Sequence, residues 1–384
     1  MRRLIKNGLV YQNGARSFLP FDILIDGERI VAISPVGTFD GSDADVIDAK
    51  GCRLTSGLID VHTHGIAGSD FLAADTSALT RMSRAYLLHG VTTVMPTLAS
   101  APLCDMADAA ERIGDFLTDN LGARFCGVHI EGRYLNSKKR GAHAQELLAP
   151  LCADELDVFA SLGLKDLHIS AAFELDNDKS FIKKALKLGA TLSLGHTNAT
   201  YEQARELEGM GVTAYTHLYN AMPPLHHREG GPVAACLLGD AFGELICDGI
   251  HVSREVVLLT YRIKRDRLTL ISDSMEATDS PDGEYSIAGN PVTVCGGIAR
   301  THDGALAGST LTLEAALQNL MSFCDIPLEE AIINATEAPA REVGIFDDCG
   351  SIDAGTRADI LLIDKDRFKI NAVICGGELT AQCY

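Results

Sequence analysis

The feature that most constrains the fold is an alternation of short apolar runs, typical of β-strands, with amphipathic runs typical of helices, from residue 57 to about 340. Repeated βα units build a parallel sheet, so the chain is expected to be an α/β protein with a (β/α)8 TIM-like barrel. Eight strand candidates can be counted, and they end near His64, Pro96, Glu131, Glu174, His196, His217, His251 and Asp273. Most of these ends carry a side chain that can bind metal or move protons, as expected where a barrel enzyme has its active site.

The two ends of the chain have a different pattern. Residues 1–55 alternate apolar and polar residues, and Asp26-Gly27 joins two β-rich runs as in a hairpin. Residues 351–377 have the same character. We therefore predict a small β-sandwich-like module from residues 1–55 and 345–384, and a barrel domain from residues 56–344. Residues 280–304 are expected to be irregular, and helices are expected over 311–323 and 328–336.

Composition limits the partners and the compartment. The chain has 384 residues with 33 basic and 52 acidic side chains, and its net charge of -19 repels nucleic acid and anionic membranes. Its 11 cysteines contain no Cys-x-x-Cys pair, which argues against a disulfide framework or a thiolate zinc site. We see no apolar run of signal-peptide or membrane-span type and expect a cytoplasmic protein.

A metal centre is predicted from imidazoles and a carboxylate at strand ends. His62 and His64 lie two residues apart on a strand candidate and so point to the same face. That spacing alone is weak evidence, but Glu131, His196 and His217 end three further strands. Such a set is typical of a catalytic zinc or iron site. Five ligands exceed the need of one tetrahedral ion, so we expect one or two divalent ions per chain, with Glu131 as the bridge if there are two.

Two further residues are assigned to the chemistry. Asp273 can take a proton from a metal-bound water and deliver it to a leaving amine, although an aspartate here can also simply cap a turn. His251 can bind substrate or polarise a scissile carbonyl. His129 shares a face with Glu131 but lies deeper, and is interpreted as a supporting or packing residue. Three other histidines lack a partner motif, and we interpret them as ordinary residues of helices or connections: His89, His168 and His302.

Three longer motifs carry a resemblance to a known family. They are Thr-His-Leu-Tyr-Asn-Ala-Met-Pro-Pro-Leu-His-His-Arg-Glu-Gly-Gly at 216–231, His-Ile-Glu-Gly at 129–132 with Lys-Arg-Gly-Ala-His at 139–143, and Leu-Ala-Gly-Ser-Thr at 306–310. In these motifs the chain resembles the N-acetylglucosamine-6-phosphate deacetylases of the amidohydrolase superfamily. The resemblance extends from the N-terminal module through the barrel to the C-terminal strands.

The resemblance implies a reaction, a site and an assembly. Glu131, His196 and His217 would hold the principal metal, and Asp273 would be the general acid/base in releasing acetate from a phosphorylated N-acetyl sugar. Homodimers are implied, in which a loop such as 226–228 contributes to the neighbouring subunit's site; Arg228 suits a phosphate. The implied substrate contacts are Ala142, His143, Asn220, Ala221, His227, Arg228, His251, Leu306, Ala307 and Gly308.

Some features depart from the family pattern and some alternatives stay open. Both first-strand imidazoles are present, whereas some relatives keep a single metal. Arg133 stands where proline is usual, and can change the rigidity or the charge of its loop; Glu276 is also less usual. The alternatives are deacetylation of N-acetylgalactosamine 6-phosphate, a cyclic-amide hydrolase or deaminase activity, and a non-catalytic metal-binding relative.

Overall fold

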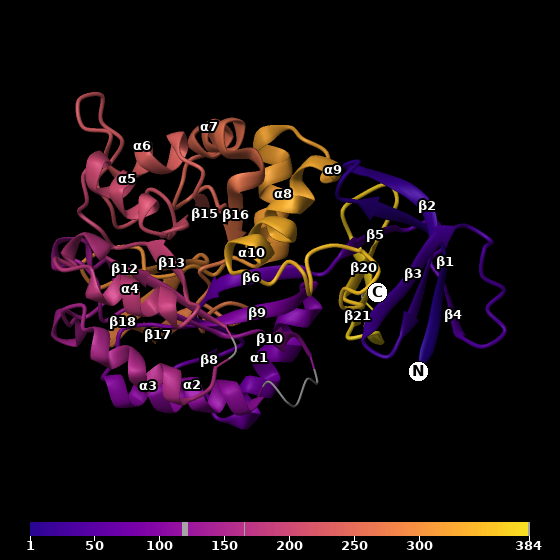
Figure 1. Cartoon of the computed structure of the whole chain (residues 1–384), viewed down its shortest axis with the longest axis horizontal. Helices are drawn as coiled ribbons and strands as arrows, with labels where there is room; N and C mark the ends of the chain where they lie inside the picture. Colours follow the sequence, from indigo (N-terminus) through magenta and orange to yellow (C-terminus); the bar gives the residue numbers. More distant parts are fainter. Residues whose placement is uncertain (117–121, 165, 383–384) are drawn as a thin grey trace.

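A nearly closed barrel of parallel strands forms the centre of the computed structural model, which describes residues 1–116, 122–164 and 166–382 (Figure 1). Its strands are β6 (Leu58–Thr63), β9 (Val91–Leu98), β10 (Arg124–Phe125), β11 (Val128–Glu131), β12 (Leu167–Ala171), β13 (Thr191–Leu194), β14 (Ala214–Tyr215), β15 (Phe242–Ile246) and β16 (Leu268–Ile271). Both β10 and β11 pair with β9, so together they occupy the third of eight positions. The last barrel strand, β16, meets the first, β6, through a hydrogen bond just beyond the end of β16: the Asp273 amide donates to the His62 carbonyl at 2.9 Å. The predicted barrel is confirmed.

Helices alternate with these strands along the chain and lie outside the barrel (Figure 1). They are α1 (Thr76–Leu88), α2 (Leu103–Phe116), α3 (Leu156–Ser161), α4 (Ser180–Lys187), α5 (Tyr201–Gly209), α6 (Gly231–Leu238), α7 (Arg254–Lys264), α8 (Leu313–Cys324), α9 (Leu328–Ala331) and α10 (Glu337–Glu342). Several begin at a side-chain cap: Asp75 accepts from the Ala78 amide, and Thr200 forms a capping box with Gln203. No helix among the described residues has the length and apolar character needed to cross a membrane.

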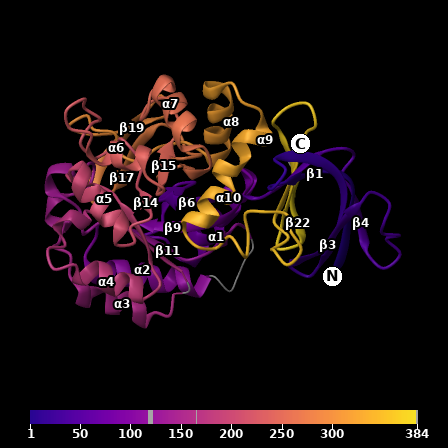
Figure 2. The ribbon, with the colours of Figure 1, turned by 45° about the horizontal axis from the view of Figure 1, so that its top comes forward.

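The two chain ends build a separate sheet beside the barrel (Figure 2). Its strands are β1 (Arg2–Gln12), β2 (Ser17–Asp26), β3 (Arg29–Pro35), β4 (Asp45–Asp48), β5 (Arg53–Ser56), β20 (Ile360–Ile363), β21 (Ile370–Cys375) and β22 (Glu378–Gln382). All belong to one sheet, in which β20 pairs antiparallel with β5 and so joins the two ends. The predicted hairpin is confirmed, with Asp26 opposite Arg29 and Gly27 at a φ of 57°. A module built from both ends is therefore present, as predicted.

The structure corrects several predicted elements. Residues 280–304 form a three-stranded antiparallel sheet of β17 (Gly283–Ile287), β18 (Asn290–Cys295) and β19 (Ile298–Thr301). Their side chains are mostly exposed or half-buried, so they lack the apolar pattern that marks a strand in sequence. The fourth barrel strand ends at Ala171 and the seventh at Ile246, so Glu174 and His251 lie in the loops beyond. His168, expected in a helix or connection, lies fully buried on β12.

Two smaller differences concern the helices and the first loop. The helix expected over 311–323 begins at Leu313, because the Thr312 side chain caps it, and ends at Cys324. The segment expected over 328–336 is α9 followed by a 3-10 turn, Ile332–Ala335. The short strands β7 (Gly65–Ile66) and β8 (Ser69–Asp70) pair directly after the first barrel strand. These elements fix the loops that surround the carboxyl ends of the barrel strands.

Candidate metal centre

The predicted metal ligands come together at the carboxyl ends of the barrel strands. Glu131 is the last residue of β11, and His62 lies on β6 with His64 just after it. His196 and His217 each follow their strands, β13 and β14, by two residues. All are at most 4 % exposed. Because parallel barrel strands end at one rim, residues far apart in sequence meet there.

One carboxylate oxygen meets two imidazole nitrogens on one side of the centre. Glu131 Oε1 lies 3.2 Å from His196 Nε2 and 3.0 Å from His217 Nε2, and the two nitrogens are 3.0 Å apart. Ligand atoms bound at about 2.1 Å around a tetrahedral ion lie roughly 3.4 Å apart, close to these separations. The three atoms therefore have the spacing of ligands of one ion.

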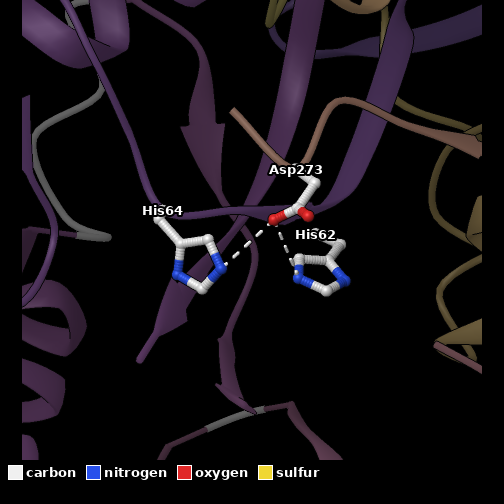
Figure 3. A group of neighbouring side chains, drawn as sticks. All are labelled: His62, His64 and Asp273. Atoms are coloured by element: carbon white, nitrogen blue, oxygen red, sulfur yellow. Dashed lines mark ion pairs between the residues drawn. The ribbon is translucent and has the colours of Figure 1, made fainter. Parts of the chain in front are cut away.

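The other oxygen of the same carboxylate belongs to a second group. Glu131 Oε2 lies 3.0 Å from His64 Nε2 and 3.4 Å from His62 Nε2. The same nitrogens lie 3.3 Å and 3.4 Å from Asp273 Oδ1, as Figure 3 shows for the two imidazoles and the aspartate. Glu131 thus stands between two sets of ligand atoms, the arrangement expected of a bridging carboxylate.

The residues fit a metal ion on two physical grounds. His62 Nε2 is completely buried and has no hydrogen-bond partner among the described residues, which is costly unless a cation binds there. His196, His217 and Asp273 also adopt left-handed backbone conformations, with φ of 47°, 32° and 47°. Such strain is typical of functional sites, where surrounding contacts hold it in place.

The loop after β13 shows how that strain is held. Glu174 accepts hydrogen bonds from Thr197 Oγ1 at 2.7 Å and from the Asn198 amide at 2.8 Å. It also accepts from Asn136 Nδ2 at 2.9 Å. Glu174, which the sequence marked as a reactive strand end, therefore anchors the loop that carries His196.

The charged groups of the centre stabilise one another. Burial by itself raises the pKa of the Glu131 and Asp273 carboxyls, but nearby imidazoles, His62 foremost, hold both pKa values below their ordinary range. Burial opposes protonation of His64, yet hydrogen bonds to Asp273 and Glu131 raise its pKa to about 9. Metal ligands must be deprotonated to bind, so a divalent cation can replace these imidazole protons as the partner of the carboxylates.

A cavity of about 310 Å³ opens onto the centre. The predicted substrate-contact residues that line it are Ala142, His143, Asn220, Ala221, His251, Leu306 and Gly308. The other three predicted contacts do not line the cavity. Ala307 is buried behind the lining. His227 and Arg228 are exposed in a loop outside it, where Arg228 Nη1 contacts His227 Nε2 at 2.8 Å. Burial, and then the nearby His196, lowers the pKa of the lining His143 to about 3. The cavity thus has a neutral imidazole beside the ligand set.

Some residues in and behind this cavity were not predicted from the sequence. Ile287 and Ala288 come from the β17–β18 hairpin, in the span expected to be irregular. Asp248 Oδ2 lies 2.6 Å from His251 Nδ1, and Asp248 Oδ1 accepts the Ile250 and His251 amides at 2.8 Å each. The motif Asp-Gly-Ile-His carried a signal for this contact, because an aspartate three residues before a histidine can close a turn onto it.

Arg133 and Glu276, two of the departures from the family pattern, have structural explanations. Arg133 has a φ of 64°, which a proline cannot adopt, and its guanidinium makes two contacts of 2.8 Å with Glu155. Its charge is therefore paired with Glu155. Glu276 accepts the Ser286 amide at 2.8 Å and so fastens the β17 hairpin beside the cavity.

The fold and this centre define a metal-dependent hydrolase of the barrel type, and comparison with known proteins agrees. The model of the amidohydrolase family matches residues 53–380, and the chain belongs to that family. Within it, the chain is 33 % identical to an N-acetylglucosamine-6-phosphate deacetylase of Vibrio furnissii, over 93 % of this chain and 90 % of the relative. It is 34 % identical to an N-acetylgalactosamine-6-phosphate deacetylase of Escherichia coli O157:H7, over 88 % of each.

Solved structures of the same kind of enzyme match the whole chain. N-acetylglucosamine-6-phosphate deacetylase of Pasteurella multocida superposes with a TM-score of 0.92 at 28 % identity and covers 100 % of both chains. A mutant of the Mycobacterium smegmatis enzyme, in complex with N-acetyl-D-glucosamine-6-phosphate, has a TM-score of 0.88 at 28 % identity, over 100 % of this chain and 99 % of that one. The resemblance predicted from the sequence motifs is confirmed.

Proposed function

We propose that this enzyme hydrolyses the acetamide of N-acetylglucosamine 6-phosphate to acetate and glucosamine 6-phosphate, a step of amino-sugar catabolism. The observation that carries the proposal is Glu131 placed between two sets of ligand atoms at the base of a cavity that Asp273 also lines. Deacetylases similar over nearly the whole chain, one of them in complex with this substrate, support it.

The ligand sets would hold one or two divalent ions, zinc or iron, at Glu131, His196 and His217 and at His62 and His64. A bound ion of this kind polarises a carbonyl and makes water a stronger acid. Asp273 accepts the proton of the attacking water and then delivers it to the departing sugar amine. In its protonated form His251 gives the Nδ1 proton to a hydrogen bond with Asp248 and would donate from Nε2 to the carbonyl oxygen as negative charge develops there. The amide C–N bond breaks, and the water oxygen leaves in acetate.

The phosphate is assigned to a loop of a neighbouring subunit. Arg228 and His227 suit a phosphate chemically, but they lie exposed and outside the lining of their own chain's cavity. We therefore propose a homodimer in which each chain supplies Arg228 to the other's substrate. The basic residues nearer the cavity are engaged otherwise: Lys139 donates to the Met222 carbonyl and Arg140 to the His143 carbonyl.

N-acetylgalactosamine 6-phosphate is the second candidate substrate, because the E. coli relative carries that activity in its name. The two sugars differ in the orientation of one hydroxyl. Steady-state acetate release should be compared for both phosphorylated sugars and their unphosphorylated forms. The proposal requires kcat/KM to be highest for N-acetylglucosamine 6-phosphate; no acetate from any phosphorylated N-acetylhexosamine would overturn it. Metal analysis of the same protein counts the ions per chain.

A further inference from the structure

The barrel interior next to the metal centre is polar, where layers of branched apolar side chains would usually pack. His129 contacts Thr97 Oγ1 at 3.1 Å and Ser170 Oγ at 2.7 Å, and Ser170 contacts Thr216 Oγ1 at 2.6 Å. All of these residues are at most 1 % exposed. Burying polar groups costs free energy even when they are paired, so this interior is expected to serve the centre.

Glu244 is the charged member of this interior. It lies on β15, fully buried, and its Oε2 is 2.8 Å from His62 Nδ1 and 3.3 Å from the His217 amide. A carboxylate can only accept, so His62 Nδ1 must carry the proton of this hydrogen bond. In a neutral imidazole the other nitrogen, Nε2, then has a free lone pair. That nitrogen faces Glu131 and Asp273, each at 3.4 Å.

Two other buried groups lie near Glu244. Glu342, on α10, is 2 % exposed and accepts a hydrogen bond from Thr269 Oγ1. Burial, and next the charge of Glu244, raises the pKa of Glu342 well above its ordinary value. On another strand, His168 Nε2 lies 3.6 Å from Glu244 Oε1, an oxygen that has no hydrogen-bond partner among the described residues. The hydrogen bonds of Glu244 therefore go through Oε2, to His62 and the His217 amide.

The other imidazoles of the centre are held differently. His196 Nδ1 contacts the Lys139 carbonyl at 2.9 Å, a neutral partner. His64 Nδ1 and His217 Nδ1 have no hydrogen-bond partner among the described residues. A carboxylate fixes an imidazole more firmly than a carbonyl does and makes it a better electron donor to a metal. Within the His62–His64–Asp273 group, the orientation of His62 thus depends on Glu244.

We propose that Glu244 is the positioning residue of the His62–His64–Asp273 group. It fixes the tautomer and the ring orientation of His62, so that Nε2 is directed at Glu131 and Asp273. In this way it sets the affinity of the group for the second metal ion. This inference rests on the proposed function in taking the two ligand sets as metal sites. It assigns a residue 182 positions from His62 in sequence to the binding of the second ion.

The test uses the full-length protein, wild type and three variants, with Zn²⁺ as the probe. Glu244→Gln keeps an acceptor but removes the charge, and Glu244→Met keeps the size but removes the acceptor. Glu111→Gln, the same substitution at an exposed position on α2, is the matched control. We expect Glu244→Gln to weaken the second Zn²⁺ equivalent roughly 10- to 100-fold and Glu244→Met to weaken it more, with the first equivalent and the control unchanged.

A second measurement does not need metal. The ¹⁵N shifts of the imidazole rings in metal-free protein, measured at a pH alkaline enough to make His62 neutral, report which nitrogen of His62 carries the proton. We expect Nδ1 in the wild type, Glu244→Gln and Glu111→Gln, and a mixture in Glu244→Met. Wild-type Zn²⁺ affinity in Glu244→Gln, or an unchanged tautomer in Glu244→Met, would overturn the proposal. If wild type binds no second Zn²⁺, the two-ion centre fails, and the tautomer comparison still decides the role of Glu244. If Glu244→Met does not fold, the Zn²⁺ affinity of Glu244→Gln decides.

Discussion

Asp248 Oδ2 lies 2.6 Å from His251 Nδ1, so the imidazole that reaches the cavity is held from behind by a carboxylate. Burial by itself raises the pKa of Asp248, but the hydrogen bond from His251 holds it below its ordinary value. The carboxylate is therefore ionised, accepts from Nδ1 of His251 and leaves Nε2 as the nitrogen that can donate to a substrate when the ring is protonated. An acid that fixes an imidazole ring through Nδ1 is also present at Glu244 and His62.

Replacing Asp248 with Asn should lower kcat while KM changes little. The amide cannot stabilise a charged imidazole and permits the wrong His251 tautomer, so the polarised carbonyl loses its donor. We expect a loss of roughly 10²-fold in steady-state acetate release. Asp43→Asn, at an exposed site in the end module, is the control and should match wild type. An unchanged kcat for Asp248→Asn would contradict the role given to the pair.

Replacing Asp273 with Asn should abolish proton transfer but keep the metal at Glu131, His196 and His217. We expect kcat to fall by roughly 10²- to 10⁴-fold, because a positioned acid/base typically contributes that much. Metal analysis of the purified variant should still find the ion held by the other three residues. Turnover that survives the change would show that another group moves the proton.

Replacing both His62 and His64 with Ala should remove at most one equivalent of metal per chain. The ligand atoms of His196 and His217 lie within 3.2 Å of Glu131 Oε1 and do not involve the altered side chains. Metal content measured after dialysis against Zn²⁺ checks this. Complete loss of metal would make the first-strand pair the primary site and the other set secondary.

Mixing two inactive variants should restore activity if Arg228 acts across a dimer interface. In a hybrid of Arg228→Ala and Asp273→Asn chains, one site has an intact Asp273 and receives Arg228 from the other chain. Random exchange gives about a quarter of wild-type activity, because half of the dimers are hybrids with one good site each. Mixing Asp273→Asn with Glu131→Gln chains should restore no activity, because each site of a hybrid then lacks one residue that its own chain must supply. Hybrid dimers seen by native mass spectrometry without recovered activity would contradict the shared site.

His89 should make stability depend on pH. It joins α1 to two carboxylates, with Nε2 at 2.6 Å from Asp279 and Nδ1 at 3.5 Å from Glu314. Hydrogen bonds to these two raise its pKa from 6.5 to about 9, so its stabilisation is complete below the unfolded value and is lost as pH rises through about 9. His89→Gln should lower the free energy of unfolding by roughly 2 kcal/mol near pH 6 and by almost nothing near pH 10.

Chemical denaturation at the two pH values measures that difference. His302→Gln, at an exposed turn position after β19, provides the control for the substitution itself. A cost of His89→Gln that stays constant with pH would mean that the side chain contributes packing only.

The barrel could be predicted because buried parallel strands are continuous apolar runs that need no partner to be recognised. The sheet of β17–β19 could not, because its strands are largely exposed and their pairing depends on tight turns such as Gly296-Gly297. Because these strands could not be recognised, Ile287 and Ala288 could not be predicted to line the cavity. His168 was misplaced because an isolated histidine gives no sign of whether it faces a barrel interior.

The residue types at the strand ends are visible in the sequence, so it could be predicted that Glu131, His196, His217, His62 and Asp273 meet. How they meet is seen in the folded barrel: which oxygen of Glu131 faces which nitrogens, that Glu244 contacts His62, and that Arg228 lies outside its own cavity. Strand periodicity is local and carries none of this information. Hydrogen bonds between residues on different strands depend on barrel register and loop conformation, which no local pattern encodes.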